Sequence, residues 1–196
     1  MQEGIADLKN NAKTPGANED GFIENPDGTL SLLEDNKAHS VKFGNKSGKK
    51  GGYHNHTLVG ISIFSPQDVR ELLGFAVAMQ PNISEGYVGM IAANRCNSGS
   101  DCINGFRFFN FIIRYTGNYN DLINSNFTEE QLSKWKEEMQ LYELYLRDDP
   151  TKYILEDGSK YMTEDALFEI FQDVLKKILV RKSRTAKGRR EYNYHC

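Results

Sequence analysis

Residues 53–68 constrain the fold of this chain more than any other segment, because they combine a strand, a loop and a helix start in a short stretch. Alternate residues of a strand point to the same face of a sheet, so His54 and His56 share one face. After a loop, Ser65 is a good helix N-cap, Pro66 suits the first helical position, and Asp68 stands where a capping box needs an acid. The segment predicts a strand followed by a helix that begins at residue 65.

The same segment offers ligands for a metal ion. Two histidines on one side of a strand can give two nitrogen ligands to one zinc ion, and Asp68 can add an oxygen ligand. Three protein ligands with a fourth position open for water is the arrangement of a catalytic zinc site. We therefore predict a zinc site at His54, His56 and Asp68. The alternative is two histidines at the surface or held by hydrogen bonds, with Ser65 and Asp68 acting only as a helix cap and its partner.

The rest of the chain predicts an α+β fold, in which a mixed or antiparallel sheet is flanked by helices and followed by a helical C-terminal extension. We expect a metal-binding core over 1–117, the extension over 118–180 packed on that core, and a basic tail over 181–196. Periodicity and turn residues predict strands at 21–24, 29–33, 40–43, 53–56, 86–93 and 106–115, and helices at 1–12 and from 65, 128 and 163, with a hairpin in the linker 147–162.

Composition limits the location and the partners. No apolar run is long enough to cross a membrane, and the polar N-terminus is not a Sec signal peptide, so we expect a cytoplasmic protein or one exported without that signal, and no membrane partner. Residues 181–196 hold six basic residues and one acid. Such a segment can bind nucleic acid or an acidic partner, although a solvated tail is the interpretation we favour. We interpret Cys96 and Cys102 as loop thiols that can pair in an oxidising compartment.

The spacing of these residues resembles a known motif. The order is His54-x-His56, then a loop, then Ser65-x-x-Asp68 at a helix start. This pattern is similar to the JAMM motif of the MPN+ family, which contains zinc isopeptidases, related bacterial peptidases and JAB domains. The resemblance implies a JAB/MPN-like core, zinc as the cofactor, and His54, His56 and Asp68 as its ligands. It also implies that Ser65 helps to stabilise the oxyanion.

The family places its catalytic glutamate upstream, near a glycine at a strand. Here Glu19, two residues before Gly21, is the best match, and Glu24 is the fallback. The chain departs from the family in the position of that glutamate, in a loop before Ser65 that is one residue longer than usual, and in Thr57 where proline commonly stands.

We expect a zinc-dependent metallopeptidase or isopeptidase-like hydrolase, in which a zinc-activated water, deprotonated by Glu19, attacks an amide or isopeptide carbonyl of a protein or peptide substrate. A bacterial effector or toxin domain is one setting, in which a cognate immunity or carrier protein would be a partner. The alternatives are a catalytically inactive JAB-like binding or assembly module, which the departures in spacing motivate, and a nucleic-acid-binding protein that uses the basic C-terminal tail.

Overall fold

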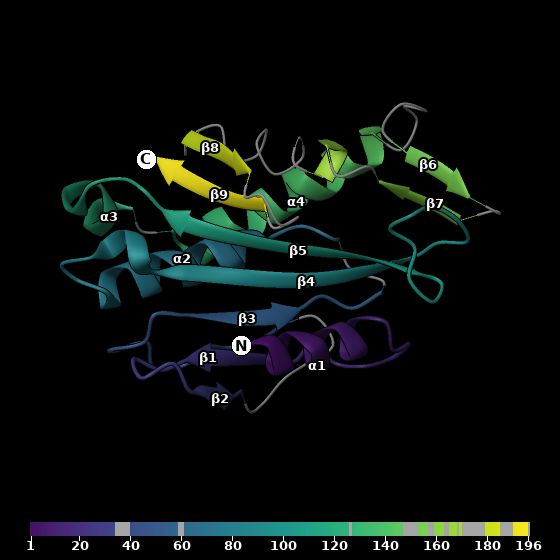
Figure 1. The fold of residues 1–196 in the computed structure, drawn as a ribbon. Helices are drawn as coiled ribbons and strands as arrows, with labels where there is room; N and C mark the ends of the chain where they lie inside the picture. Colours follow the sequence, from purple (N-terminus) through teal and green to yellow (C-terminus); the bar gives the residue numbers. More distant parts are fainter. Residues whose placement is uncertain are drawn as a thin grey trace.

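The computed structural model describes residues 1–33, 40–58, 61–125, 127–146, 153–156, 159–162, 165–167, 169, 179–184 and 190–195. The chain is α+β, with a mixed sheet flanked by helices, as the sequence predicts (Figure 1). No helix among the described residues is both long enough and apolar enough to cross a membrane.

The main sheet has seven strands in the order β2-β1-β3-β4-β5-β9-β8 (Figure 1). The pairs β3–β4 and β5–β9 are parallel, and the other neighbouring pairs are antiparallel. A separate antiparallel hairpin is formed by β6 and β7. The strands are β1 (Gly21–Glu24), β2 (Leu30–Leu32), β3 (Gly51–Asn55), β4 (Tyr87–Arg95), β5 (Phe106–Tyr115), β6 (Tyr153–Glu156), β7 (Ser159–Met162), β8 (Leu179–Arg184) and β9 (Arg190–His195).

Helices cover the two faces of this sheet. The helices are α1 (Gln2–Ala12), α2 (Pro66–Ala78), α3 (Tyr119–Asn124) and α4 (Glu129–Leu146), with a short 3-10 turn, η1 (Ile83–Glu85). One apolar core lies between α1 and a sheet face that includes Tyr53. The larger core lies on the opposite face, where α2 and α4 pack. Since side chains alternate along β3, His54 faces the α2 side of the sheet.

The predicted strand faces and helix starts are confirmed where the structure describes them. The predicted apolar face of β5 is buried in the core on the α2 side, and consists of Phe109, Phe111, Ile113 and Tyr115. Helices α1, α2 and α4 form where predicted. At the start of α4, Thr128 Oγ1 accepts a hydrogen bond from the Gln131 backbone N–H, and Gln131 Oε1 accepts one from the Thr128 N–H. The helix predicted from 163 is seen at 165–167 and 169, and its remainder lies outside the described residues.

Three regions differ from the prediction. The strand predicted at 40–43 is wrong beyond a single bridge residue at 40, because the apolar alternation there reflects burial of Val41 and Phe43 in the core rather than strand pairing. Helix α3 was not predicted, although Asn118 caps it by accepting a hydrogen bond from the Asp121 N–H. In the segment predicted as a tail, β8 and β9 add to the main sheet; residues 185–189 and 196 lie outside the described residues.

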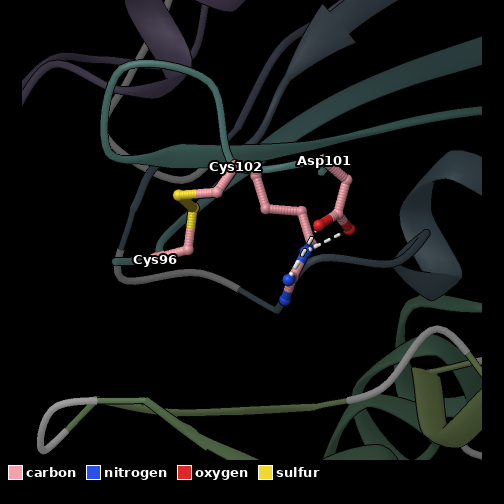
Figure 2. The surroundings of a disulfide bond; sticks show 4 residues. Cys96, Asp101 and Cys102 are labelled. Carbon is pink, nitrogen blue, oxygen red and sulfur yellow. Dashed lines mark hydrogen bonds and ion pairs between the residues drawn. A yellow bond between two sulfur atoms is a disulfide. The ribbon is translucent and has the colours of Figure 1, made fainter. Parts of the chain in front are cut away.

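A disulfide and an ion pair stabilise the connection between β4 and β5. Cys96 and Cys102 form a disulfide, and Arg107 forms an ion pair with Asp101 (Figure 2). The chain then reverses at Asn104 and Gly105, whose φ angles of 52° and 80° are those that a two-residue hairpin turn favours. The two thiols are therefore a structural pair within one loop.

Candidate metal centre

The structure brings His54, His56 and Asp68 together in the interior. His54 lies near the end of β3 and His56 directly follows that strand, and Asp68 projects from the first turn of α2, which packs on the same face of the sheet. His54 Nε2 lies 3.0 Å from His56 Nε2 and 3.1 Å from Asp68 Oδ1, and His56 Nε2 lies 3.6 Å from Asp68 Oδ2. Among the described residues, these three form the group whose donor atoms all lie within 4.8 Å of one another, and they could hold a metal ion.

These separations suit a small divalent cation. Zinc binds nitrogen and oxygen ligands at about 2.0–2.1 Å with tetrahedral geometry, which places two ligands about 3.3 Å apart. The three observed separations lie on both sides of that value. The set of two imidazoles and one carboxylate is also a common ligand set of zinc sites with an open coordination position.

The ring of His56 is oriented by the loop that follows it. His56 Nδ1 lies 2.6 Å from the carbonyl oxygen of Ile61. A carbonyl can only accept a hydrogen bond, so Nδ1 carries the hydrogen, and in the neutral ring Nε2 then has a free lone pair directed at the other two groups. A hydrogen bond on the far nitrogen of a metal-binding histidine commonly fixes its tautomer in this way.

The carboxylate of Asp68 is oriented by the cap of α2. Asp68 Oδ2 accepts hydrogen bonds from the Ser65 backbone N–H at 2.7 Å and from the Ser65 hydroxyl at 2.8 Å. The Asp68 N–H in turn donates to Ser65 Oγ at 3.3 Å, which completes the predicted capping box. Oδ1 is the oxygen that faces His54. The first turn of the helix therefore sets the direction of the Asp68 carboxylate.

His54 is held by packing instead. Its ring lies edge-on to Phe43, with the ring centroids 5.9 Å apart, and 5.0 Å from the ring of His56. Its Nδ1 is buried and has no hydrogen-bond partner among the described residues. The two histidines are thus supported differently: one by a backbone carbonyl, the other by an aromatic neighbour.

The charges of the site are strongly coupled. Burial alone would lower the pKa of His56, but the Asp68 carboxylate, with a contribution from Glu19 and from the Ile61 carbonyl, raises it to about 9. Burial alone would raise the pKa of Asp68, but His54 and His56 hold it well below its usual range. The site therefore keeps an ionised carboxylate in the interior and attracts positive charge, whether as a proton or as a metal ion.

Glu19 lies at this site, and Glu24 does not. The register pairs Gly21 of β1 with His54 of β3, and continued by two residues it places Glu19 opposite His56. Glu19 is 7% exposed, and its charge acts on His56. Glu24, at the far end of β1, accepts a 2.6 Å hydrogen bond from the hydroxyl of Tyr87.

Glu19 does not belong to the group whose donor atoms all lie within 4.8 Å. It lies opposite His56 in the register, outside the three candidate ligands. The sequence predicted His54, His56 and Asp68, which the structure brings together, named Ser65, which caps α2, and proposed Glu19 ahead of Glu24. It missed the Ile61 carbonyl and Asn55. No side-chain motif could reveal the carbonyl, because it is a backbone group. The only signal for Asn55 was its place between the two histidines.

Comparison of the chain with protein-family models, curated proteins and solved structures finds no match. The assignment of the site therefore rests on its geometry and its chemistry.

Proposed function

We propose that the protein is a zinc-dependent hydrolase that cleaves an amide or isopeptide bond in a protein or peptide, in the manner of the JAMM family. The observation that carries this proposal is the buried cluster of His54, His56 and Asp68, with Glu19 placed opposite His56 by the register of β1 on β3. Two imidazoles and a carboxylate bind zinc and leave a coordination position open.

Each residue has a defined part in this proposal. When bound, zinc supplies a Lewis acid that polarises a carbonyl and lowers the pKa of a water molecule. Glu19 accepts a proton from the attacking water and returns it to the leaving amine. Ser65 orients Asp68 through its hydroxyl and backbone N–H. The oxyanion contact that the resemblance implies for Ser65 would require its hydroxyl to leave Asp68 Oδ2 when substrate binds.

A second function is favoured by the burial of the site. Four residues of the site are between 2% and 7% exposed: His54, Asp68, His56 and Glu19. A metal ion enclosed in this way could hold the end of β3 against α2 without contacting any substrate, as in a structural zinc site. The protein would then be a JAB-like binding or assembly module. The two functions share the metal and differ in whether the open position is reached by a substrate.

A cleavage screen separates the two functions. Zinc-loaded protein is incubated with a proteome-derived peptide library and with isopeptide-linked conjugates, and new termini are identified by mass spectrometry. We expect cleavage by the zinc-loaded protein that is lost when zinc is removed with a chelator and restored when it is returned.

The matched controls are Glu19, two residues before β1, and Glu24, at the end of β1. We expect Glu19→Gln to lower the cleavage rate by about 10²- to 10⁴-fold, the usual contribution of a general base, while zinc remains bound. Glu24→Gln should leave the rate within about threefold. Bound zinc without cleavage of any library member would support the binding module, and equal effects of the two substitutions would contradict the proposed role of Glu19.

A further inference from the structure

Asn55 stands between the two histidines and points to the opposite face of the sheet. It is fully buried, and its contacts converge on the segment that carries Glu19. Its backbone N–H donates to the Asp20 carbonyl at 3.0 Å, and its Oδ1 accepts from the Asp20 backbone N–H at 2.9 Å. The residue that follows Glu19 is therefore held at both of its backbone groups by one asparagine.

Helix α1 holds the residue before Glu19. Asn11, in the last turn of α1, donates from Nδ2 to the Asn18 carbonyl at 2.7 Å and to Asn55 Oδ1 at 3.1 Å. One amide group of α1 thus joins Asn18 to the side chain that already holds Asp20. The backbone on both sides of Glu19 is fixed by the same pair of asparagines.

We propose that Asn55 and Asn11 are positioning residues that hold Glu19 opposite His56. This inference rests on the proposed function, since it concerns the general base of that site. Glu19 lies before the first residue of β1. At this point the side-chain hydrogen bonds of Asn55 and Asn11, which we call the asparagine clamp, continue the attachment of the chain to β3. These side-chain hydrogen bonds add to the backbone bond from the Asn55 N–H to the Asp20 carbonyl, which also holds this segment to β3.

The chemistry of the position requires an amide. Asn55 Oδ1 accepts two hydrogen bonds, and its Nδ2 donates a long one, at 3.4 Å, to the His56 carbonyl. Alanine would leave the Asp20 N–H without its acceptor. A carboxylate would add a buried negative charge beside a site that already contains Glu19 and Asp68, at a large desolvation cost. The same clamp explains why α1 ends against the end of β3 that carries the site.

The test uses the protein loaded with Co²⁺, whose visible absorption reports the surroundings of the ion. We compare the wild type, Asn55→Ala, Asn11→Ala and Glu19→Gln, with Asn118→Ala as the matched control, since it removes an asparagine that binds a backbone N–H far from the site. Each protein is measured for bound cobalt per chain and for its spectrum across a pH series. Where a cleaved peptide is available, kcat and KM are measured as well.

We expect all five proteins to bind about one cobalt ion per chain. The pH dependence of the spectrum should move in Asn55→Ala and Asn11→Ala in the same direction as in Glu19→Gln, and stay at the wild-type position in Asn118→Ala. The value of kcat should fall by about 10- to 100-fold in the two asparagine variants, on the scale of a displaced catalytic group, with little change in KM. If Asn55→Ala does not fold, the half-buried Asn11, at a helix end, carries the test.

The outcomes distinguish failure of the proposed function from failure of this inference. Failure of the wild type to bind cobalt or zinc would overturn the proposed function and this inference together. Binding by all proteins, with a spectrum that changes in Glu19→Gln but in neither asparagine variant, would overturn the inference and leave the proposed function standing. A loss of bound metal in Asn55→Ala and Asn11→Ala would also overturn it, because the clamp would then support the ligands rather than Glu19.

Discussion

Glu19, two residues before β1, and Glu24, the last residue of β1, each lie beside a partner from another part of the sheet, but in different chemical settings. Before the strand, Glu19 lies opposite His56, which belongs to a cluster with a second histidine and an aspartate. At the end, Glu24 accepts a hydrogen bond from the neutral hydroxyl of Tyr87. The first end concentrates ionisable groups that can exchange protons or bind a cation, whereas the second makes one ordinary structural contact.

The alternation of a strand explains why only one glutamate can serve the site. Residues 19 and 24 are separated by an odd number of positions, so their side chains point to opposite faces of the sheet. His54 and His56 face the side covered by α2, and Tyr87 belongs to the core on the α1 side. A motif match can propose either glutamate, but the sheet admits only the one that shares a face with the histidines.

The largest change in zinc affinity should come from removing the carboxylate of Asp68. We expect Asp68→Ala to weaken zinc binding by more than about 100-fold, because a ligand contributes more than the 10- to 100-fold typical of groups that only orient ligands. Competition with a chromophoric chelator measures this loss. The matched control is Asp121→Ala, which removes the corresponding acid from the first turn of α3 and should leave zinc affinity unchanged.

A smaller change in zinc affinity should come from removing the Ser65 hydroxyl, which orients the Asp68 carboxylate. We expect Ser65→Ala to weaken zinc binding by about 10- to 100-fold, since the Asp68 carboxylate loses its hydroxyl partner. The lost cap should also lower the free energy of unfolding by about 1 kcal/mol. Thr128→Ala removes the equivalent cap from α4 and should reproduce only the loss of stability, as measured by urea unfolding and the same chelator competition. Equal zinc affinities in the two variants would contradict the role of Ser65 in the site.

The smallest effect, a loss of stability without a change in zinc affinity, is expected at the Glu24 end of β1. We expect Tyr87→Phe to lower the free energy of unfolding by about 1 kcal/mol at neutral pH, the usual net value of one hydrogen bond, with zinc affinity unchanged. Burial and the bond to Glu24 raise the pKa of Tyr87 well above its usual range. Because the raised pKa belongs to the folded state, this contribution is fully present below about pH 10 and is lost as the pH rises further.

Urea unfolding of wild type and Tyr87→Phe between pH 7 and 11 therefore provides the measurement. The stability difference between the two proteins should shrink, and can reverse, above about pH 10. A difference that stays constant over this range would show that the Tyr87 hydroxyl is not held as the structure places it.

The parts of the fold that depend on local signals could be predicted from the sequence. The start of α2 follows from Ser65, Pro66 and Asp68, and the common face of the two histidines follows from strand alternation. Both are properties of one continuous segment. This is why three residues that meet in the structure, His54, His56 and Asp68, could be predicted as one site from local sequence signals.

The parts that depend on register could not be predicted. Alternation shows that Glu19 and Glu24 face opposite sides, but only the pairing of Gly21 with His54 shows which of them shares a face with the histidines. The Ile61 carbonyl that orients His56 is a backbone group, and the sequence carries no signal for it. The strand predicted at 40–43 failed for a related reason, because alternating burial can arise in a loop that lies on a core.

The most direct test of the account is the metal content of the purified protein. The protein is prepared without chelators, supplied with zinc, freed of excess ion, and analysed for zinc per chain beside a His54→Ala/His56→Ala double variant. We expect about one zinc per wild-type chain and none retained by a folded double variant. A folded wild-type protein that retains no zinc, or a double variant that retains as much as the wild type, would contradict it.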